Sequence, residues 1–185
     1  MKPVPHIEIR EFPDSALPQL WAWCEAFRNQ VADDYSPKTI DKFVEYELER
    51  TRAKVLKFGV YRDGELGGCI WVEQLSDLIA EAHCVFKRDF FGQATTLPAL
   101  KLMAEMIFET GIKKIKMRTF RDNSAIKSLL LNAGAHQEGI LRQETVRNGK
   151  LIDILLFAFF DEDLKRQQED GSFPWRKSKS KEQSA

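Results

Sequence analysis

The sequence has no apolar run long enough to cross a lipid bilayer. A membrane-spanning helix needs about 20 apolar residues, whereas the most continuous apolar stretch, residues 151–160, is far shorter and contains Asp153. The N-terminus, MKPVPHIEIREF, also lacks the apolar segment that signal peptides carry. We therefore expect neither secretion nor a membrane partner, and we predict a cytoplasmic protein.

The sequence also has few cysteines and no net charge. The three cysteines, Cys24, Cys69 and Cys84, are odd in number and lie among apolar neighbours. This pattern indicates small buried thiols and argues against a disulfide framework or a zinc site, so we expect no bound metal. Lysine plus arginine equals aspartate plus glutamate at 28 each, so no overall field favours nucleic acid as a partner.

Hydrophobic and aromatic residues, in contrast, are plentiful at 43% and 11% of 185 residues. A chain of this length and composition can bury the core of one domain. The composition becomes polar and basic near residue 165, so we predict a domain over residues 1–164 and a tail over residues 165–185. Alone, such a tail is disordered. It contains the aromatic group Phe173-Pro174-Trp175, and we expect residues 173–181 to fold back on the domain or to dock on a protein partner.

Four stretches have apolar residues at the spacing of an amphipathic helix. Ser36-Pro37 is typical of an N-cap followed by a first-turn proline, and Gly134 stands where a helix commonly ends in a left-handed residue. The predicted helices cover residues 17–31, 37–52, 97–110 and 124–133.

Seven further stretches are typical of β-strands because they alternate or are continuously apolar. Asp63-Gly64 and Asn148-Gly149 separate two pairs of them, and such dipeptides favour tight hairpin turns. The predicted strands cover residues 7–12, 55–61, 66–74, 78–86, 112–120, 137–146 and 151–160. The order β-α-α-β-β-β-α-β-α-β-β predicts an α/β fold in which four helices flank a mixed, twisted sheet of about six or seven strands.

This order, together with a spaced set of residues in the C-terminal half, resembles the GCN5-related N-acetyltransferases (GNAT), particularly the Rim-like branch that modifies protein N-termini and some small amines. The similarity covers roughly residues 5–163. The residues that carry it are Asn123, Gly134, Glu138-Gly139-Ile140-Leu141-Arg142, Asn148-Gly149, Asp153 and Asp161-Glu162-Asp163.

The resemblance implies the GNAT fold and acetyl-CoA as acyl donor. In that fold, strand 78–86 lies parallel to strand 112–120, the helix 97–110 connects them by a right-handed crossover, and the two strands splay apart. The unpaired backbone groups at the splay hydrogen-bond the pantetheine arm. The resemblance assigns that role to Val85 and Phe86.

The loop before the third helix implies a pyrophosphate site, because a helix N-terminus attracts phosphate. The family motif there is Arg or Gln, two residues, Gly, one residue, then Gly or Ala. With Gly92 set on the glycine that commonly precedes the central one, Phe91, Ala94 and Thr96 occupy the motif positions. Alternatively, Arg88 and Gly92 match, with a spacing that is one residue too long.

By resemblance, the loop residues that would contact the donor are Gly92, Gln93, Ala94, Thr95 and Thr96. Ala94 replaces a glycine, so its Cβ crowds the approach of a phosphate. The hydroxyl groups of the two threonines offer partial compensation.

Transfer of an acyl group to an amine needs a base for the amine proton. Glu81 and His83 are two apart in strand 78–86, so they share a face and can form a proton relay near neutral pH. The alternative is a solvated strand face that carries charge without a catalytic role. Glu73 is a weaker candidate for the base.

Three residues in the C-terminal half have more than one interpretation. Asn123 either binds the cofactor, as the resemblance implies, or caps the fourth helix. Asp153 is a carboxylate in an apolar strand, so we expect Arg142 or Arg147 to pair with it. Leu130 stands where many family members carry a tyrosine that protonates the departing thiolate.

Two functions follow from these observations. The first is an N-acetyltransferase acting on a protein N-terminus, a lysine or a small amine, as a monomer or a homodimer. The second is a GNAT-fold binding or assembly module with weak or lost catalysis, which the degenerate loop and the aromatic, basic tail favour. The layout also resembles small GNAT-like proteins with such loops that occur in bacteriophages. In that case the protein would act in the host cytoplasm or the virion.

Overall fold

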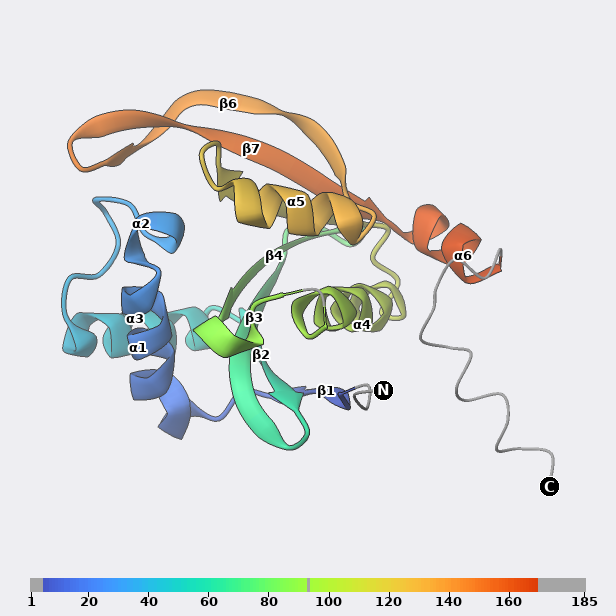
Figure 1. Cartoon of the computed structure of the whole chain (residues 1–185), viewed down its shortest axis with the longest axis horizontal. Coiled ribbons are helices and arrows are strands. Elements are labelled where there is room, and N and C mark those ends of the chain that lie inside the picture. The colour runs from blue at the N-terminus through green and yellow to red at the C-terminus, as the bar shows by residue number, and fades with distance from the viewer. Residues whose placement is uncertain (1–4, 93, 170–185) are drawn as a thin grey trace.

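The computed structural model describes residues 5–92 and 94–169. Seven strands form one mixed sheet in the order β1-β2-β3-β4-β5-β7-β6 (Figure 1). All neighbouring strands are antiparallel except β4 and β5, which are parallel. The strands are β1 (Ile7–Glu11), β2 (Leu56–Arg62), β3 (Glu65–Gln74), β4 (Ile79–Phe86), β5 (Lys114–Phe120), β6 (His136–Arg147) and β7 (Lys150–Phe160). The α/β fold class predicted from the sequence is confirmed.

The described residues also contain six α-helices and two short 3-10 helices. They are α1 (Leu17–Ala26), α2 (Arg28–Val31), α3 (Ile40–Arg52), α4 (Thr96–Phe108), α5 (Ser124–Asn132) and α6 (Asp161–Glu169), with η1 (Asp14–Ala16) and η2 (Arg88–Phe90). None of the described helices is long and apolar enough to span a bilayer.

The helices differ from the sequence prediction in three places. The predicted helix 37–52 begins at Ile40 with Thr39 as its N-cap, so the predicted cap at Ser36-Pro37 is wrong. Residues 17–31 form two helices, because Phe27 leaves helical geometry with φ −122°. Helix α6 crosses the predicted tail boundary at residue 164. Its first turn is acidic, which suits the positive end of a helix dipole, and Leu164 is buried. The aromatic group at 173–175 lies outside the described residues.

Helices cover both faces of the sheet and give the molecule two cores (Figure 1). One core lies under α4, α5 and α6 and includes Leu100, Ile115 and Phe157, each fully buried. The other lies under α1 and α3 and includes Leu20 and Trp71. Burial of each large apolar side chain contributes about 1.5–3 kcal/mol relative to exposure, so both faces hold the sheet in place.

The parallel pair β4 and β5 separates after three residues. Pairing runs from Ile79↔Lys114 to Glu81↔Lys116, although β4 continues to Phe86 and β5 to Phe120. Helix α4 connects the two strands across one face of the sheet. The predicted parallel, splayed pair is therefore confirmed, and an open gap in the backbone hydrogen bonding lies at the centre of the sheet.

The β6–β7 hairpin turns at Asn148 and Gly149, with φ 55° and 70°. These positive values confirm the predicted tight turn, which glycine and asparagine favour. The carboxylate of Asp34 accepts hydrogen bonds from both turn N–H groups at 2.9 Å. Asp33 Oδ2 accepts another from the Thr145 hydroxyl at 2.7 Å. The loop between α2 and α3 is thereby fastened to the hairpin tip.

The charged residue of β7, Asp153, has a different partner from the one predicted. Its Oδ2 is 2.7 Å from Arg121 Nη1, and its Oδ1 accepts from the Gln143 N–H at 3.0 Å. Of the two predicted partners, Arg147 pairs with Asp122 instead. The hydrogen bonds from Gln143 and Arg121 lower the pKa of Asp153, and Arg142 acts on that carboxylate only through its charge. Strand β6 bulges at Gln143, which has φ 54°, so the register beyond it does not follow from counting residues.

Candidate functional site

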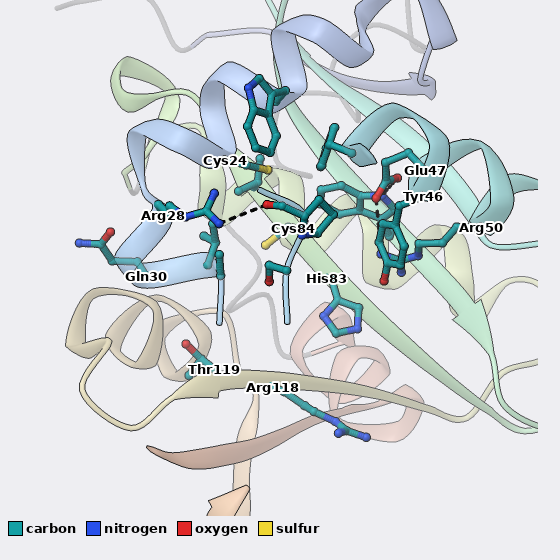
Figure 2. Close-up of a pocket in the computed structure, with 18 of the residues that line it drawn as sticks. Cys24, Arg28, Gln30, Tyr46, Glu47, Arg50, His83, Cys84, Arg118 and Thr119 are labelled. Carbon is teal, nitrogen blue, oxygen red and sulfur yellow. Dashed lines mark hydrogen bonds and ion pairs between the residues drawn. The ribbon is translucent and has the colours of Figure 1, made fainter. Parts of the chain in front are cut away.

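A cavity of about 640 Å³ lies on the α1–α3 side of the sheet (Figure 2). Cys84 of β4 and Met117 of β5 line it and also pack against the core under α4. The cavity therefore enters the gap where β4 and β5 diverge. Its wall is aromatic and charged, with Trp21, Phe43, Tyr46, Trp71, Phe120, Glu25, Arg28, Glu47, Arg50, Glu73, His83 and Arg118.

Backbone groups alternate in direction along β4, and two hydrogen bonds fix which ones meet β3. The Ile79 carbonyl accepts from the Leu75 N–H at 2.9 Å, and the Lys87 N–H donates to the Gly67 carbonyl at 2.9 Å. Because successive residues of an extended strand point to opposite sides, the odd-numbered residues of β4 pair with β3. The even-numbered residues face β5 and, beyond residue 81, the open gap.

This alternation selects among the residues that we predicted to hold the pantetheine arm. The backbone of Phe86 faces the gap, whereas Val85 is directed toward its β3 partner Cys69. Cys84 also faces the gap and was not predicted. Of the two predicted residues, only Phe86 has backbone groups that face the gap. Contact of either residue with a pantetheine arm stays a prediction.

The loop before α4 is held by Thr96. Its hydroxyl accepts from the Gly92 N–H and donates to the Phe90 carbonyl, each at 3.0 Å. The Gly92 carbonyl in turn accepts from the N–H groups of Thr95 and Thr96 at 3.3 and 2.8 Å. Three of the N–H groups that could meet a phosphate are therefore used within the loop itself. Gln93, a further predicted contact, lies outside the described residues.

Arg62 supports the same loop from the end of β2. It donates to the Asp89 carbonyl at 2.8 Å and to the Thr95 hydroxyl at 3.3 Å, and its guanidinium lies 4.1 Å from the Phe90 ring centroid. Phe90 is fully buried against Gly67, where an added Cβ would lie 2.3 Å from the ring. The ring is therefore part of the core, and it does not line the cavity.

The structure brings Glu81 and His83 together, as the sequence predicted. Glu81 Oε1 is 3.2 Å from His83 Nε2 and 3.0 Å from Arg118 Nε. The hydrogen bond from His83 lowers the pKa of Glu81, burial opposes this, and the charge of Arg118 lowers the pKa further. Glu81 is buried and His83 is 40% exposed. Glu81 is therefore an ionised partner, and His83 is the group that can meet a ligand.

Glu47 and Trp71 belong to the site although they were not predicted. Glu47 lies on α3, is 1% exposed, and accepts a hydrogen bond from the Trp71 indole at 2.6 Å. Trp71 is the direct cross-strand partner of His83. Figure 2 shows Glu47 beside Tyr46 and Arg50 at the cavity wall. Glu47 stands four residues after Phe43 on the buried side of α3, and a carboxylate at such a position was visible in the sequence.

Asn123 acts as an N-cap in the structure. Its side-chain oxygen accepts from the Ile126 N–H at 3.2 Å, and its amide donates to the Gln30 carbonyl at 3.3 Å. The residue is 8% exposed. The capping role is therefore present, and both ends of the amide have partners in the protein. Contact between Asn123 and a cofactor stays a prediction.

All three cysteines are free thiols. Cys24 and Cys84 line the cavity, and burial raises the pKa of each to about 12. Since the thiolate is the nucleophile, neither sulfur is activated for attack near neutral pH. These residues contribute to the cavity as apolar surface.

No family model matches the chain, and no curated protein matches its sequence. Solved structures do match. A ribosomal-protein-alanine N-acetyltransferase from Brucella melitensis has a TM-score of 0.68 at 18% identity, covering 83% of this chain and 99% of its own. A mutant form of the spermidine N-acetyltransferase SpeG from Vibrio cholerae has a TM-score of 0.74 at 15% identity. The match covers 88% of this chain and 98% of that protein. The apo ribosomal L7/L12 alpha-N-protein acetyltransferase RimL has a TM-score of 0.70 at 18% identity. The match covers 85% of this chain and 92% of that protein.

These likenesses concern the fold, because the identities are low. The seven-stranded mixed sheet of this chain, with its diverging parallel pair, is the fold of the GCN5-related N-acetyltransferases. The family's fold was expected from the sequence and is confirmed.

Proposed function

We propose that this protein transfers an acetyl group from acetyl-CoA to an amine. The divergence of β4 and β5 at the mouth of a cavity carries this proposal. An extended, amide-containing chain can hydrogen-bond the open strand edge there, as a further strand would. At its C-terminal end, β4 leads through η2 and the Gly92 loop into α4. The N-terminus of that helix favours an anion because of the helix dipole.

The residues present fit the pantetheine arm well and the pyrophosphate less well. The backbone groups of Cys84 and Phe86 face the gap and would hold the arm. The loop would hold the pyrophosphate, yet the N–H groups of Gly92, Thr95 and Thr96 already have acceptors within it. Acetyl-CoA supplies an activated acyl group as a thioester; the protein supplies position and proton transfer.

His83 is the base that the geometry favours. It lines the cavity, and its Nε2 lies 3.2 Å from the buried carboxylate of Glu81. A neutral imidazole accepts the proton that an attacking ammonium must lose, while an ionised Glu81 stabilises the imidazolium that forms. Arg118 holds Glu81 from the neighbouring strand at 3.0 Å. Glu81 and Arg118 are therefore positioning residues in this proposal.

The acceptor is an amine whose class the sequence left open between a protein N-terminus, a lysine and a small amine. The structural relatives include an enzyme named for the alanine of a ribosomal protein and one named for spermidine. The cavity, at about 640 Å³, has room for a small ligand or the end of a peptide.

One observation favours the alternative of a binding module with weak catalysis. The internal hydrogen bonds of the Gly92 loop must open, or be bypassed, before a diphosphate can use those N–H groups. A chain that kept the fold but bound no acyl donor would have this arrangement.

Calorimetric titration with acetyl-CoA distinguishes the two functions, and thiol release in the presence of primary amines measures turnover. Micromolar binding and amine-dependent thiol release are expected for the enzyme. No heat at millimolar acetyl-CoA, with no thiol release, would contradict it and leave the binding module.

A further inference from the structure

We propose that Glu47 determines acceptor specificity by binding a second positive charge on the substrate, beside the amine that is acetylated. The proposal rests on the acetyl-transfer function proposed above and concerns the same cavity. It assigns to the protein a preference for amines that carry a nearby cationic group.

Glu47 is a buried carboxylate with one oxygen incompletely paired. Its Oε2 accepts from the Trp71 indole at 2.6 Å. The nearest ion-pair partner of Oε1 is Arg50 Nη1 at 3.7 Å, beyond hydrogen-bond length. The residue is 1% exposed and lines the cavity. A buried carboxylate is stable only when paired and hydrogen-bonded, so a cation arriving from the cavity would complete its coordination.

Aromatic rings stand beside this carboxylate. The Arg50 guanidinium lies 5.6 Å from the Tyr46 ring centroid and 5.8 Å from that of Trp71. These distances are typical of cation–π attraction. The protein thus already places one cation of its own near both rings and near Glu47, so the surroundings of this carboxylate suit positive charge.

The other charges of the cavity leave it acidic at this position. Arg118 is paired with Glu81, and Arg28 donates to the Pro37 carbonyl and pairs with Glu25. Glu73 lines the same cavity, and within the described part of the chain no lysine, arginine or histidine lies within ion-pair distance of it. Among the cations that line the cavity, Arg50 is the one close to Glu47, and Glu73 adds a second negative charge to the lining. A ligand cation is therefore attracted rather than repelled.

Glu47 is linked to the proposed base, His83, through one residue, Trp71. Trp71, which holds the carboxylate, is paired across the strands with His83. Directly opposed residues have Cβ atoms about 5 Å apart, so an amine near His83 and a cation at Glu47 are separated by roughly the width of one indole. A short diamine, or an amine flanked by another cation, spans that separation.

A purely structural role is the competing explanation. Glu47 orients Trp71, and its backbone carbonyl accepts from Lys57 at 3.4 Å. A structural role predicts that Glu47→Gln changes the reaction of all acceptors equally and only slightly, because glutamine keeps the size and can keep the indole hydrogen bond. A charge role predicts that only acceptors with a second cation are weakened.

The test compares 1,5-diaminopentane with pentylamine, which differ by one ammonium group. Wild type, Glu47→Gln, Arg50→Gln and the control Glu49→Gln are measured for kcat/KM with each amine. Glu49 is on the same helix but exposed. We expect wild type to prefer the diamine, and Glu47→Gln to reduce the diamine-to-monoamine ratio about tenfold or more, the scale of one hydrogen bond to a charged group.

Arg50→Gln removes the competing cation and should raise the same ratio, and Glu49→Gln should leave it unchanged. Opposite effects of the two cavity variants support the charge role. Equal losses for both amines in both variants, or a wild type that prefers the monoamine, overturn it.

Calorimetric binding of the two amines to wild type and Glu47→Gln gives a second readout that needs no turnover. Tighter diamine binding that is lost in Glu47→Gln supports the proposal even in a protein that transfers no acetyl group, which would separately end the proposed function. Equal binding of the two amines to wild type overturns the proposal. Circular dichroism confirms that each variant is folded.

Discussion

Arg118 and Glu81 join two strands at the point where their backbones separate. Glu81↔Lys116 is the last backbone pair of β4 and β5, and Arg118 Nε lies 3.0 Å from Glu81 Oε1 just beyond it. The hydrogen bond from His83 and the charge of Arg118 lower the pKa of Glu81 in spite of its burial, so the carboxylate is held in its ionised form. The ion pair therefore connects β4 and β5 through side chains at the point where their backbone hydrogen bonds end.

The stability of the protein should depend on pH through Glu81. The hydrogen bond from His83 and the charge of Arg118 lower the pKa of Glu81 in the folded state. A lowered carboxyl pKa stabilises the fold above the unfolded value, about 4.3, and that contribution is lost as the pH falls through the folded pKa. We expect Glu81→Gln to destabilise the protein more at pH 7 than at pH 4.

Urea denaturation at the two pH values measures this difference. The exposed Glu109→Gln makes the same chemical change and should show little loss at either pH. A Glu81→Gln loss of equal size at pH 7 and pH 4 contradicts the linkage.

Acetyl transfer should depend more on His83 than on Glu81. His83 lines the cavity and is the proposed base, whereas Glu81 acts through it. Removal of a general base typically reduces turnover by about 10² to 10⁴-fold, so His83→Ala should lose about 10²-fold or more in kcat. Glu81→Gln should lose less, because the glutamine oxygen still accepts a hydrogen bond from the imidazole.

Steady-state kinetics at neutral pH with a saturating amine measure both values. Calorimetry on each variant checks that donor binding is kept. Unchanged kcat in His83→Ala would show that another group, or water, takes the proton.

Local sequence rules predicted those parts of the fold that depend on neighbouring residues. Asn148-Gly149 specified its own turn, since its positive φ values need no distant contact. The splay of β4 and β5 required more, and it came from the resemblance in element order. Phe27 shows the limit, because Val31 continues the helical spacing through a break that only three-dimensional packing reveals.

The site was less predictable because it is built from residues that only the fold brings together. Glu47 interrupts an apolar pattern, and nothing local shows that Trp71, 24 positions away, donates to it. The choice between Val85 and its neighbours depends on which edge of β4 meets β3, which the amino-acid pattern does not contain. The bulge at Gln143 changes the partner of Asp153 for the same reason.

Asp34 should keep the loop between α2 and α3 against the hairpin. Its carboxylate accepts from the N–H groups of Asn148 and Gly149, and its own N–H donates to the Val146 carbonyl at 2.8 Å. Asp34→Ala removes the two side-chain acceptors. We expect faster hydrogen exchange of the Asn148 and Gly149 amides and of the loop residues 32–39, since their protection depends on these bonds.

Hydrogen exchange with mass spectrometry measures this change peptide by peptide. Asp77→Ala, at an exposed turn between β3 and β4, is the matched control and should leave the hairpin peptides unchanged. Ala32, Ser36 and Pro37 of the loop line the cavity. Loosening of the loop in Asp34→Ala should therefore also raise KM for the amine. An unaltered exchange pattern would mean that the hairpin holds the loop without Asp34.

We predict that the Gly92 loop affects how tightly the acyl donor is held. In the first of the two motif registers, Ala94 replaces the central glycine, and in that register its Cβ would crowd the approach of a phosphate to the backbone. Ala94→Gly should tighten acetyl-CoA by about 1 kcal/mol, the scale of one charge-assisted hydrogen bond among several. The neighbouring Thr96 hydroxyl holds the Gly92 N–H and the Phe90 carbonyl at 3.0 Å each, so Thr96→Val should free the N–H and loosen the loop.

Titration of wild type, Ala94→Gly and Thr96→Val with acetyl-CoA, and with CoA lacking the acetyl group, measures both effects. If the loop contacts the pyrophosphate, Ala94→Gly gains the same factor for the two ligands, because the change is remote from the thioester. Thr96→Val should lower the melting temperature, since it leaves the buried Phe90 carbonyl and the half-buried Gly92 N–H unpaired. Identical affinities in wild type and Ala94→Gly would mean that the diphosphate does not touch this loop, and that Cys84 and Phe86 alone hold the donor.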